Sequence, residues 1–290
     1  YRWGQSVSIS ASPATNSKFT TWSQTSGTTS SFASSATAST TFTMPTSAAT
    51  IYADGYFGDN TMQGFTLAKC KSEASSTNKT LTDFRDSKTY AIRYIGSICW
   101  MVQNLRYIVI ASDVSGKMTL SATTSNINSD VVLSYEDLTQ GNSTTIPRLH
   151  VNTASDVDSA GARLSSYYAV EQVGVLYNYA AASGGYISSS SSTIESDYSI
   201  CPKNWRLPTR AEAETILSYQ SLFQPIYGGF YMDGSYHNID TSGDWWTSTA
   251  STSYSRYFLR YDKLNDPFSV TYDTGQGRNR GFRVRCVRTS

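Results

Sequence analysis

The stretch Leu207-Pro-Thr-Arg-Ala-Glu212 carries the strongest local signal in this 290-residue chain. The Thr209 side chain can cap the backbone N–H of Glu212, and the Glu212 carboxylate can reach back to the N–H of Thr209, which makes a capping box. Pro208 disfavours an earlier helix start because it restricts the backbone of the residue before it. The pattern predicts a helix over about residues 209–220. The side chains that would share one face of this helix are Ala213, Ile216, Leu217 and Gln220.

Short strands and loops surround this helix in the sequence. Glycines separate short aromatic segments between the helix and Cys286, and Gly174 divides a candidate helix–strand segment over residues 167–182. A Gly- and Ser-rich tract over residues 183–192 predicts an exposed loop. We therefore expect one well-capped helix among many short strands and loops in this region.

The N-terminal region differs from the rest of the chain, because it is rich in Thr, Ser and Ala and carries almost no charge. Val7, Ile9 and Ala11 alternate with serines, as in a half-buried strand. Three or four short strands with one apolar face are enough for a small module. We therefore predict a β module over residues 1–55 and a second domain over residues 56–290. The further strands of the module are predicted at residues 19–22, 40–44 and 49–53.

Composition and charge exclude several functional classes. Lys plus Arg number 23 and Asp plus Glu 22, so the formal net charge of +1 provides no basic field for binding nucleic acid. No stretch approaches the roughly 18 consecutive apolar residues of a membrane span. Charged residues are 16% of the chain, against about a quarter in a typical soluble domain, which favours a crowded exterior with close subunit contacts. The chain opens on Tyr1 without an initiator Met, so we expect a processed or partial chain.

The four cysteines favour disulfides over a metal site. None belongs to a C-x-x-C pair, and the two histidines are too few to complete a zinc site. Structural disulfides imply an oxidising compartment, so we expect an extracellular or cell-surface protein without a metal or cofactor. Spacing alone leaves three pairings open. The cysteines are Cys70, Cys99, Cys201 and Cys286.

No catalytic arrangement is evident in the sequence. His150 lies in a strand-like segment and His237 in a loop-like one, and neither has a nucleophile motif nearby. Asn265 and Asp266 could offer oxygen ligands to a hard cation, but a turn stabilised by their side chains is the favoured interpretation. We therefore expect no enzymatic activity, no catalytic residue and no metal site.

The last part of the chain carries a series of closely spaced arginines. Their alternation with other residues predicts a strand whose charged side chains are solvated. This interpretation gives them no function as a group, although one of them, Arg278, is also a candidate contact residue. The arginines are Arg278, Arg280, Arg283, Arg285 and Arg288.

Four short blocks in the N-terminal region resemble the InlB B-repeat-like modules of bacterial surface proteins. The resemblance implies a spacer or presentation module without chemistry of its own. A generic Thr-rich β segment is the alternative, because short strands are ambiguous in sequence. The matching blocks are Val7-Ser-Ile-Ser-Ala-Ser-Pro13, Lys18-Phe-Thr-Thr-Trp-Ser23, Thr41-Phe-Thr-Met-Pro45 and Ala49-Thr-Ile-Tyr-Ala53.

A longer series of blocks over residues 61–288 resembles the Fibrobacter succinogenes major paralogous domain, which occurs in secreted and lipid-anchored bacterial proteins. The number of blocks found in one order makes this resemblance specific. They are Met62-Gln-Gly-Phe65, Leu81-Thr-Asp-Phe-Arg-Asp86, Lys88-Thr-Tyr90, Cys99-Trp-Met-Val-Gln-Asn-Leu105, Leu176-Tyr-Asn-Tyr-Ala-Ala181, Cys201-Pro-Lys-Asn-Trp-Arg-Leu-Pro-Thr209, Trp246-Thr-Ser-Thr249 and Gly281-Phe-Arg-Val-Arg-Cys-Val287.

This second resemblance implies a loop-rich, mixed α+β structure with a C-type-lectin-like fold, related to that of the formylglycine-generating enzymes. In such a fold a terminal strand pair draws the ends of the domain together, and large loops carry any function. The resemblance also implies the disulfides Cys70–Cys99 and Cys201–Cys286. With all four cysteines paired, the reactive cysteines of the formylglycine-generating relatives are missing, so their activity does not carry over. The calcium-ligand motifs of sugar-binding C-type lectins are missing as well.

Two segments are candidate interaction sites. Aromatic residues interleaved with polar ones after the helix suit a contact surface, because Tyr and Trp give a large contact area at low entropic cost. Side chains that simply fill the strands are an equally good interpretation of residues 254–272. The first strand, through Gln5, Val7, Ile9 and Ala11, is a candidate for pairing with a neighbour's sheet edge. The candidate contact residues are Trp245, Tyr254, Tyr257, Tyr261, Asn265, Asp266, Tyr272 and Arg278.

Together these features favour a non-enzymatic protein of a bacterial exterior. The first hypothesis is a structural subunit of a surface filament, pilus or coat, whose partners are copies of itself. The alternative is an adhesin or ligand-binding module that uses lectin-like loops to bind a glycan or a host protein. An enzyme is a remote third hypothesis, which only a deep pocket with converging acids of perturbed pKa would support.

Overall fold

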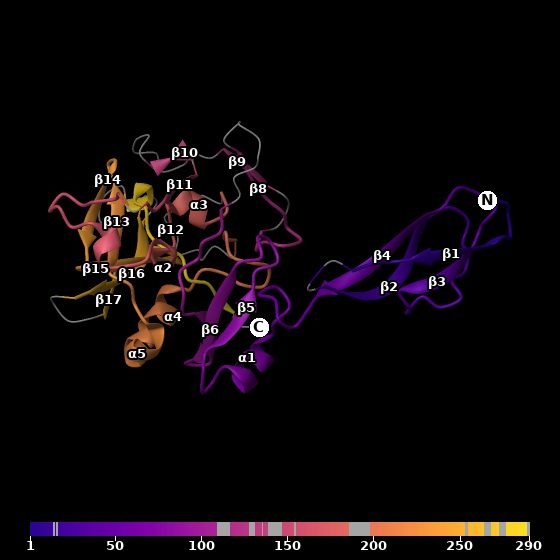
Figure 1. The fold of residues 1–290 in the computed structure, drawn as a ribbon, viewed down its shortest axis with the longest axis horizontal. Coiled ribbons are helices and arrows are strands. Elements are labelled where there is room, and N and C mark those ends of the chain that lie inside the picture. The colour runs from indigo at the N-terminus through magenta and orange to yellow at the C-terminus, as the bar shows by residue number, and fades with distance from the viewer. Residues whose placement is uncertain are drawn as a thin grey trace. The chain divides into compact units, whose positions relative to one another are not determined.

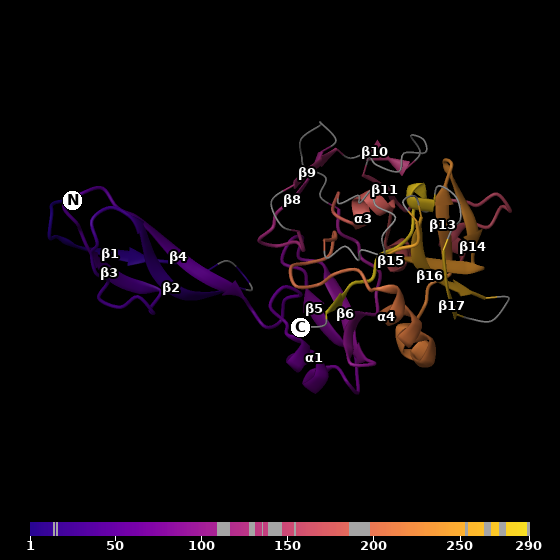
Figure 2. The same cartoon turned by 180° about the vertical axis from the view of Figure 1, so that it is seen from behind.

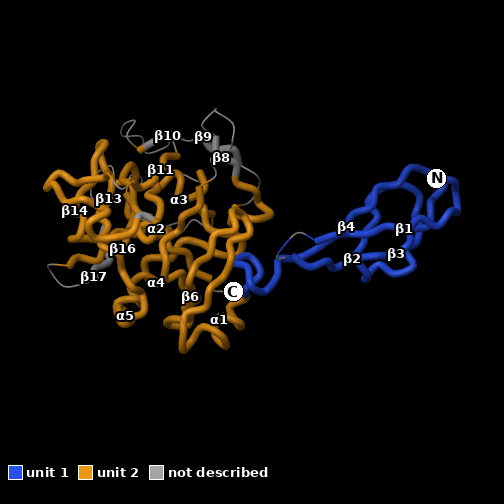
Figure 3. The backbone as a smooth tube through the Cα atoms, viewed as in Figure 1, with its two compact units in different colours: residues 1–65 blue, residues 66–290 orange. Residues whose placement is uncertain are grey.

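The computed structural model describes residues 1–13, 15, 17–108, 117–127, 131–134, 136–138, 147–153, 155–185, 198–252, 255–263, 268–272 and 277–288. The chain divides into two compact units, Tyr1–Phe65 and Thr66–Ser290 (Figure 3). The division lies after Phe65 instead of after residue 55. Strand β4 (Thr50–Phe57) carries the first unit beyond residue 55, and the Thr61 N–H then closes a turn onto the Gly58 carbonyl at 2.9 Å.

Unit 1 consists of two antiparallel strand pairs, which are labelled in Figure 1. β1 (Ser6–Ser10) pairs with β3 (Ser39–Thr43), and β2 (Ser17–Ser26) pairs with β4. All four strands lie in the segments where the sequence predicted them, although β2 and β4 extend beyond the expected ranges. Unit 1 is therefore a β module, as its composition and alternation indicated.

A row of aromatic rings forms the interior of unit 1. Trp22 and Phe42 are buried, and the ring of Phe32 lies 6.3 Å from the first and 4.9 Å from the second. The Trp22 indole N–H donates to the Thr37 carbonyl at 3.0 Å, so its one polar group is satisfied. Residues 31–33 hydrogen-bond to β3 on the side opposite β1. β3 therefore has neighbours on both sides, whereas β1 has one among the described residues.

Unit 2 contains the remaining elements in short pieces. Its helical segments are α1 (Leu67–Glu73), η2 (Leu164–Ser166), α2 (Val170–Val173), α3 (Tyr179–Ala182), α4 (Arg210–Thr215), η3 (Ile216–Tyr219), α5 (Gln220–Phe223) and η4 (Gly277–Asn279). Its strands are β5 (Lys79–Thr82), β6 (Thr89–Ile95), β7 (Ile98–Met101), β8 (Lys117–Leu120), β9 (Val131–Ser134), β10 (Glu136–Asp137), β11 (Arg148–Val151), β12 (Val175–Tyr177), β13 (Gly228–Met232), β14 (Ser235–Ile239), β15 (Ser242–Ala250), β16 (Arg256–Asp262), β17 (Phe268–Tyr272) and β18 (Val287–Arg288). The structure is rich in strands with short helices among them, which is compatible with the expected α+β class.

A four-stranded antiparallel sheet, in the order β18-β7-β6-β5, joins the start and the end of unit 2. Val287 of β18 lies opposite Trp100 of β7, so the terminal strand returns to the first hairpin of the unit. This is the terminal strand pairing that the second resemblance implied. The other described sheets are β14-β13-β15-β16-β17, β10-β11-β12 and the pair β8-β9.

The C-terminal segment, residues 281–288, runs through the middle of unit 2 (yellow in Figure 1). Its backbone bridges Phe282 to Tyr177 of β12 and Arg283 to Trp245 of β15 before it reaches β7. Because protein covers this segment on several sides, the prediction of solvated arginines is wrong. Arg280 is half-buried, and the buried members of the series are Arg278, Arg283, Arg285 and Arg288.

The predicted capping box forms at the start of α4. The Thr209 hydroxyl accepts from the Glu212 N–H at 3.2 Å, and the Glu212 carboxylate accepts from the Thr209 N–H at 2.8 Å. A continuous helix to residue 220 is wrong, because α4 ends at Thr215 and a 3₁₀ turn separates it from α5. Four of the residues 215–219, all except Leu217, have only modest helix propensity, and the φ of Tyr219 is −131°, outside the helical range. The break allows Phe223 to enter the interior.

The main core of unit 2 lies between the four-stranded and five-stranded sheets. In both Figure 1 and Figure 2, α4 lies between β6 and β16. Its buried Ala213, with Ile216 of η3 and Phe223 of α5, joins residues of both sheets in one cluster. Phe223 packs edge-on against Trp100 and Trp245, with ring centroids 6.0 Å and 5.2 Å apart. Trp205 and Trp246 are also buried. The core therefore depends on large aromatic side chains, which offset the shortness of the elements.

Candidate functional site

The outer edge of β1 presents backbone groups that lack a strand partner. Gln5 accepts a backbone hydrogen bond from the β3 side, and Ala11 donates one, each over 2.9 Å. The N–H and C=O groups of successive residues point to opposite sides of a strand. Ser6, Ser8 and Ser10 therefore direct theirs away from β3. No strand pairs with this edge in the part of the chain that the structure describes. The edge is thus open to a further strand.

The four residues predicted for strand pairing lie on β1 or directly beside it. Their backbone N–H and C=O groups point towards β3 and not towards the open edge. Gln5, Val7, Ile9 and Ala11 direct their hydrogen-bonding groups towards β3, and the last three side chains are half-buried in unit 1. The prediction thus identified the strand, but the groups free to meet a neighbour belong to the serines between the four named residues.

This edge lacks the features that usually prevent strand pairing. Residues 5–12 contain no charged residue and no proline, and β1 pairs with β3 without a register shift. β4 also has one strand partner among the described residues, but it carries Asp54, and register shifts interrupt its pairing with β2. Edge charges and bulges disfavour pairing with other chains. β1 is therefore more receptive to a further strand than β4.

The structure separates the residues of the predicted aromatic contact surface. Trp245 is 1% exposed and Arg278 is 4% exposed, so the prediction is wrong for these two interior residues. Tyr257 and Tyr261 are half-buried on β16. The remaining candidates fall on Tyr254, Asn265 and Asp266, which lie outside the described residues, and on Tyr272, whose side chain does so as well.

Cations accompany the two half-buried tyrosines of β16. The Arg210 guanidinium lies 4.3 Å from the centre of the Tyr257 ring. The Tyr261 ring lies 4.8 Å from that of Tyr227, over which the Lys263 ammonium is placed at 5.6 Å. Burial and a hydrogen bond with Tyr261 raise the pKa of Tyr227, so this hydroxyl stays protonated. These contacts form two partly exposed groups of aromatic and basic side chains, one near each end of β16.

Two disulfides tie distant parts of unit 2 together. Cys70 of α1 is bonded to Cys99 of β7, and Cys201 is bonded to Cys286 next to β18. These are the pairings that the second resemblance implied, and they use all four cysteines. Both bridges end on the four-stranded sheet or beside it, so they fix the sheet that joins the two ends of the unit.

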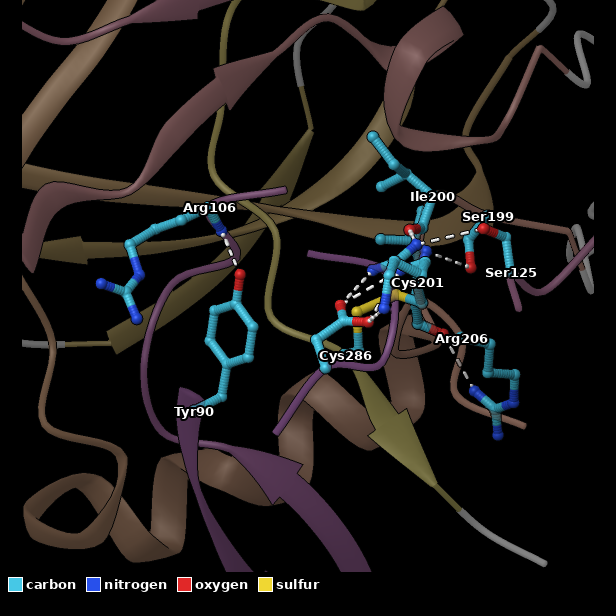
Figure 4. The surroundings of a disulfide bond; sticks show 11 residues. Tyr90, Arg106, Ser125, Ser199, Ile200, Cys201, Arg206 and Cys286 are labelled. Atoms are coloured by element: carbon cyan, nitrogen blue, oxygen red, sulfur yellow. Dashed lines mark hydrogen bonds and ion pairs between the residues drawn. A yellow bond between two sulfur atoms is a disulfide. The ribbon is translucent and has the colours of Figure 1, made fainter. Parts of the chain in front are cut away.

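Backbone hydrogen bonds surround the Cys201–Cys286 bridge (Figure 4). The Cys201 N–H donates to the Ser199 hydroxyl at 3.3 Å. On the other side, Val287 and Arg206 exchange backbone hydrogen bonds of 2.8 Å and 3.0 Å. The bridge therefore lies in a segment whose backbone polar groups are already paired, which suits a structural disulfide.

A buried ion pair contacts Ile200, the residue that precedes Cys201 of this bridge. The side chains of Asp83 and Arg85 have no solvent exposure, and their charged groups approach to 2.7 Å. Arg85 also donates to the Ile200 carbonyl at 2.6 Å and lies 3.6 Å from the Tyr107 ring centre. Burial alone would lower the pKa of Arg85, but the charge and hydrogen bonds of Asp83 raise it. Both charges have partners, so the pair serves the fold.

The described residues contain no metal-binding cluster, in the sense of three or more His, Cys, Asp or Glu side chains placed around one point. His150 lies 3.3 Å from the Asp156 carboxylate and stacks on Tyr231, with ring centroids 4.3 Å apart. His237 lies 3.3 Å from the Met232 carbonyl. The absence of enzymatic activity stays a prediction.

In the part of the chain that the structure describes, no helix is both long and apolar enough to cross a membrane.

The sequence interpretation missed two interior arginines, Arg283 and Arg285. The only signal was their alternation with Phe282, Val284 and Cys286, which would also suit a strand with one solvated face. Their hydrogen-bond acceptors are oxygens of residues far away in the sequence, so no local pattern announces them.

Residues 1–54 match the family described as the divergent InlB B-repeat domain. The match agrees with the predicted InlB B-repeat-like module and identifies this region as a module of bacterial surface or extracellular type. Together with the two disulfides, it indicates an extracellular or cell-surface protein. No curated protein and no solved structure matched the chain. The similarity of residues 61–288 to the Fibrobacter succinogenes domain stays a prediction.

Proposed function

We propose that the chain is a non-enzymatic structural subunit of a bacterial surface assembly, in which copies meet through the outer edge of β1. Unit 1 supplies the contact, and unit 2 is the disulfide-bonded part that the assembly displays. The observation that carries the proposal is the open edge of β1, which is regular, uncharged and without a strand partner in the described residues.

An added strand forms backbone hydrogen bonds with such an edge and needs no pocket. Ser6, Ser8 and Ser10 offer the N–H and C=O groups, and their exposed side chains are small enough to let another backbone approach. A second copy suits this edge because Ser6-Val-Ser-Ile-Ser10 has nearly the same pattern in both directions. The edge is therefore close to self-complementary.

Centring an antiparallel pair of copies on Ser8 places Ser6 opposite Ser10 and Val7 opposite Ile9. Cross-strand pairs of this kind stabilise a sheet by roughly 0.2–1 kcal/mol each. Such a contact is isologous and produces a closed pair. Extension into a filament, pilus or coat would then use further contacts on each copy.

Unit 2 fits the role of a displayed domain. We place it in the Fibrobacter succinogenes major paralogous domain family, with a C-type-lectin-like fold, on the residue blocks that it shares with that family. Its two disulfides and its terminal strand pair support this placement. Disulfides that close long loops restrict the unfolded chain, which suits a domain that must persist outside the cell.

Adhesion is the second candidate function. The two partly exposed groups on β16, Tyr257 with Arg210 and Tyr261 with Tyr227 and Lys263, favour it, because tyrosines and arginine are enriched where proteins bind other molecules. An adhesin would use these groups on unit 2, whereas an assembly subunit uses β1 of unit 1. Variants in the two places therefore separate the two functions.

Replacing Ser8 by proline tests the proposed function. Proline removes an N–H that points away from β3, and proline is tolerated in an edge strand at such positions. We expect the unchanged protein to sediment as dimers or larger species as its concentration rises, and Ser8→Pro to sediment as a monomer. Ser8→Thr keeps the N–H and should assemble like the unchanged protein. A protein that stays monomeric, or a Ser8→Pro variant that assembles equally well, contradicts the proposal.

A further inference from the structure

Unit 2 contains a small cavity of about 210 Å³ beside the C-terminal segment. Its lining includes Arg285, Arg106 and Glu171, together with glutamines from three different segments of the chain. Sites for drug-sized ligands measure roughly 300–1,000 Å³. A cavity of this size therefore suits a ligand as small as a single sugar residue.

Arg285 is the unusual member of this lining. Its side chain is buried, and its guanidinium donates to Asn104 Oδ1 at 2.8 Å, to the Gln224 carbonyl at 3.0 Å and to the Phe223 carbonyl. All three acceptors are neutral, and none of the described carboxylates forms an ion pair with it. A guanidinium has five N–H donors, so two remain without an acceptor in the described structure.

The charge of Arg285 is therefore uncompensated inside the protein. Burial, and secondly the charge of Arg283, lower its pKa to about 9. A buried charge is stabilised when an opposite charge with matching geometry is placed beside it. The planar fork of a guanidinium matches a carboxylate in this way.

The other polar groups of the cavity also offer mainly donors. The Gln103 side-chain oxygen accepts from the Ala91 N–H at 2.9 Å, and the Gln172 oxygen accepts from the Ala169 N–H at 3.2 Å. Their NH₂ groups are therefore available to a ligand. Arg106 adds a second, half-buried guanidinium, which donates one bond to a backbone carbonyl. Such a lining favours a ligand that is rich in acceptor oxygens.

We propose that this cavity binds the carboxylate of an acidic sugar, a hexuronate, with Arg285 and Arg106 as the carboxylate-binding groups. The ring and hydroxyl oxygens of the sugar accept from the NH₂ groups of Gln103 and Gln172. Glu171 is the acidic residue of the lining, and it is exposed to water, so it weakens binding of the anion only slightly.

A purely structural role for Arg285 is the competing explanation. Its guanidinium lies 4.1 Å from the Phe223 ring centre and 5.1 Å from that of Trp245, contacts that would stabilise the core without a ligand. Arg283 provides the comparison, because it is also buried and also donates to backbone carbonyls, at Val173 and Gly229, but does not line the cavity. Only a ligand-binding role predicts that changes at the more exposed lining residues, Arg106 and Glu171, which form the rim of the cavity, alter the affinity for the sugar.

The full chain is titrated with glucuronate, glucose and acetate at low ionic strength, and binding is measured by calorimetry or by NMR chemical shifts. We expect saturable binding of glucuronate, at least about tenfold weaker binding of acetate, and no saturable binding of glucose, because only glucuronate combines the charge with the sugar oxygens. Arg285→Lys should weaken glucuronate binding about tenfold or more, because lysine lacks the bidentate fork.

Two rim variants keep the test decisive if Arg285→Lys fails to fold. Arg106→Gln should weaken glucuronate binding, and Glu171→Gln should strengthen it about two- to fivefold, as expected for loss of one exposed like charge. Asp233→Asn is the matched control, because Asp233 is an exposed carboxylate of the β13–β14 turn that does not line the cavity. Absence of saturable glucuronate binding, equal binding of glucose or acetate, or a Glu171→Gln variant no different from Asp233→Asn would overturn the proposal.

Discussion

Single residues decide where the helical segment of unit 2 begins. The Thr209 hydroxyl and the Glu212 carboxylate cap each other's backbone N–H groups, and the carboxylate also binds Arg206 at 2.6 Å. Burial alone would raise the pKa of Glu212, but the hydrogen bonds and charge of Arg206 and the bonds to Thr209 lower it. The ionised carboxylate therefore stabilises the native state at neutral pH, and this contribution is lost as the pH falls through its lowered pKa.

Thr209→Ala should lower the free energy of unfolding by about 1 kcal/mol, because it leaves the Glu212 N–H without its acceptor. Urea denaturation followed by circular dichroism measures the change. Thr215→Ala is the matched control in the same helix, since its hydroxyl donates to the Glu212 carbonyl and caps no N–H. We expect little or no loss there, and equal losses at both positions would contradict the capping role.

The capping box was predictable from sequence because all its partners lie within four residues of one another. Arg285 was not, because its partner Asn104 lies 181 residues earlier in the chain. The sequence interpretation also placed Trp245 on a contact surface, for the same reason. The indole of Trp245 donates to Asn104 in the interior, and 141 residues separate the two in the chain. Period-two alternation gives the faces of a strand, but it cannot tell whether another element covers the second face.

At the scale of elements, the strands of unit 1 were the most predictable part of the fold, since alternation and short Thr-rich runs mark them directly. The helix of unit 2 was predictable at its start and not at its end. Its end depends on how Phe223 packs between Trp100 and Trp245, which lie in other elements. The open edge of β1 depends on strand order, which sequence periodicity does not reveal.

The two disulfides should contribute unequally to the stability of unit 2. They span 29 and 85 residues. In the chain-entropy model the shorter loop contributes about 3 to 4 kcal/mol and the longer about 4 to 5 kcal/mol. The double variant Cys201→Ser/Cys286→Ser should therefore lower the melting temperature more than Cys70→Ser/Cys99→Ser. The reverse order in calorimetry would show that loop length does not govern their effect.

At the scale of the whole molecule, buried tyrosines predict alkaline unfolding. Burial raises the pKa of Tyr107, and separately that of Tyr168, to about 12 from the ordinary value of 10.0. Between these two values the unfolded chain releases protons that the native protein holds, so the free energy of unfolding falls as the pH rises. Below the ordinary value both states keep these protons, so the free energy of unfolding is not reduced by the two tyrosines.

Urea denaturation at a series of pH values, from just below 10.0 to about 12, measures this fall. Tyr107→Phe keeps the ring over Arg85 but removes the ionisable hydroxyl, so its stability should depend less steeply on pH over the same range. An equally steep dependence in the variant would mean that Tyr107 does not contribute.

An assembly subunit of the proposed kind requires two copies to meet at β1. Cross-linking of Ser8→Cys under mild oxidation tests this most directly, because Ser8 lies opposite its own copy in the symmetric pair. The Cα atoms of such a hydrogen-bonded pair lie about 5.5 Å apart, within the range of disulfides. We predict rapid dimer formation by Ser8→Cys and little by Ser6→Cys, which would face Ser10 of the other copy. Equal cross-linking at both positions, or none at either, would contradict the account.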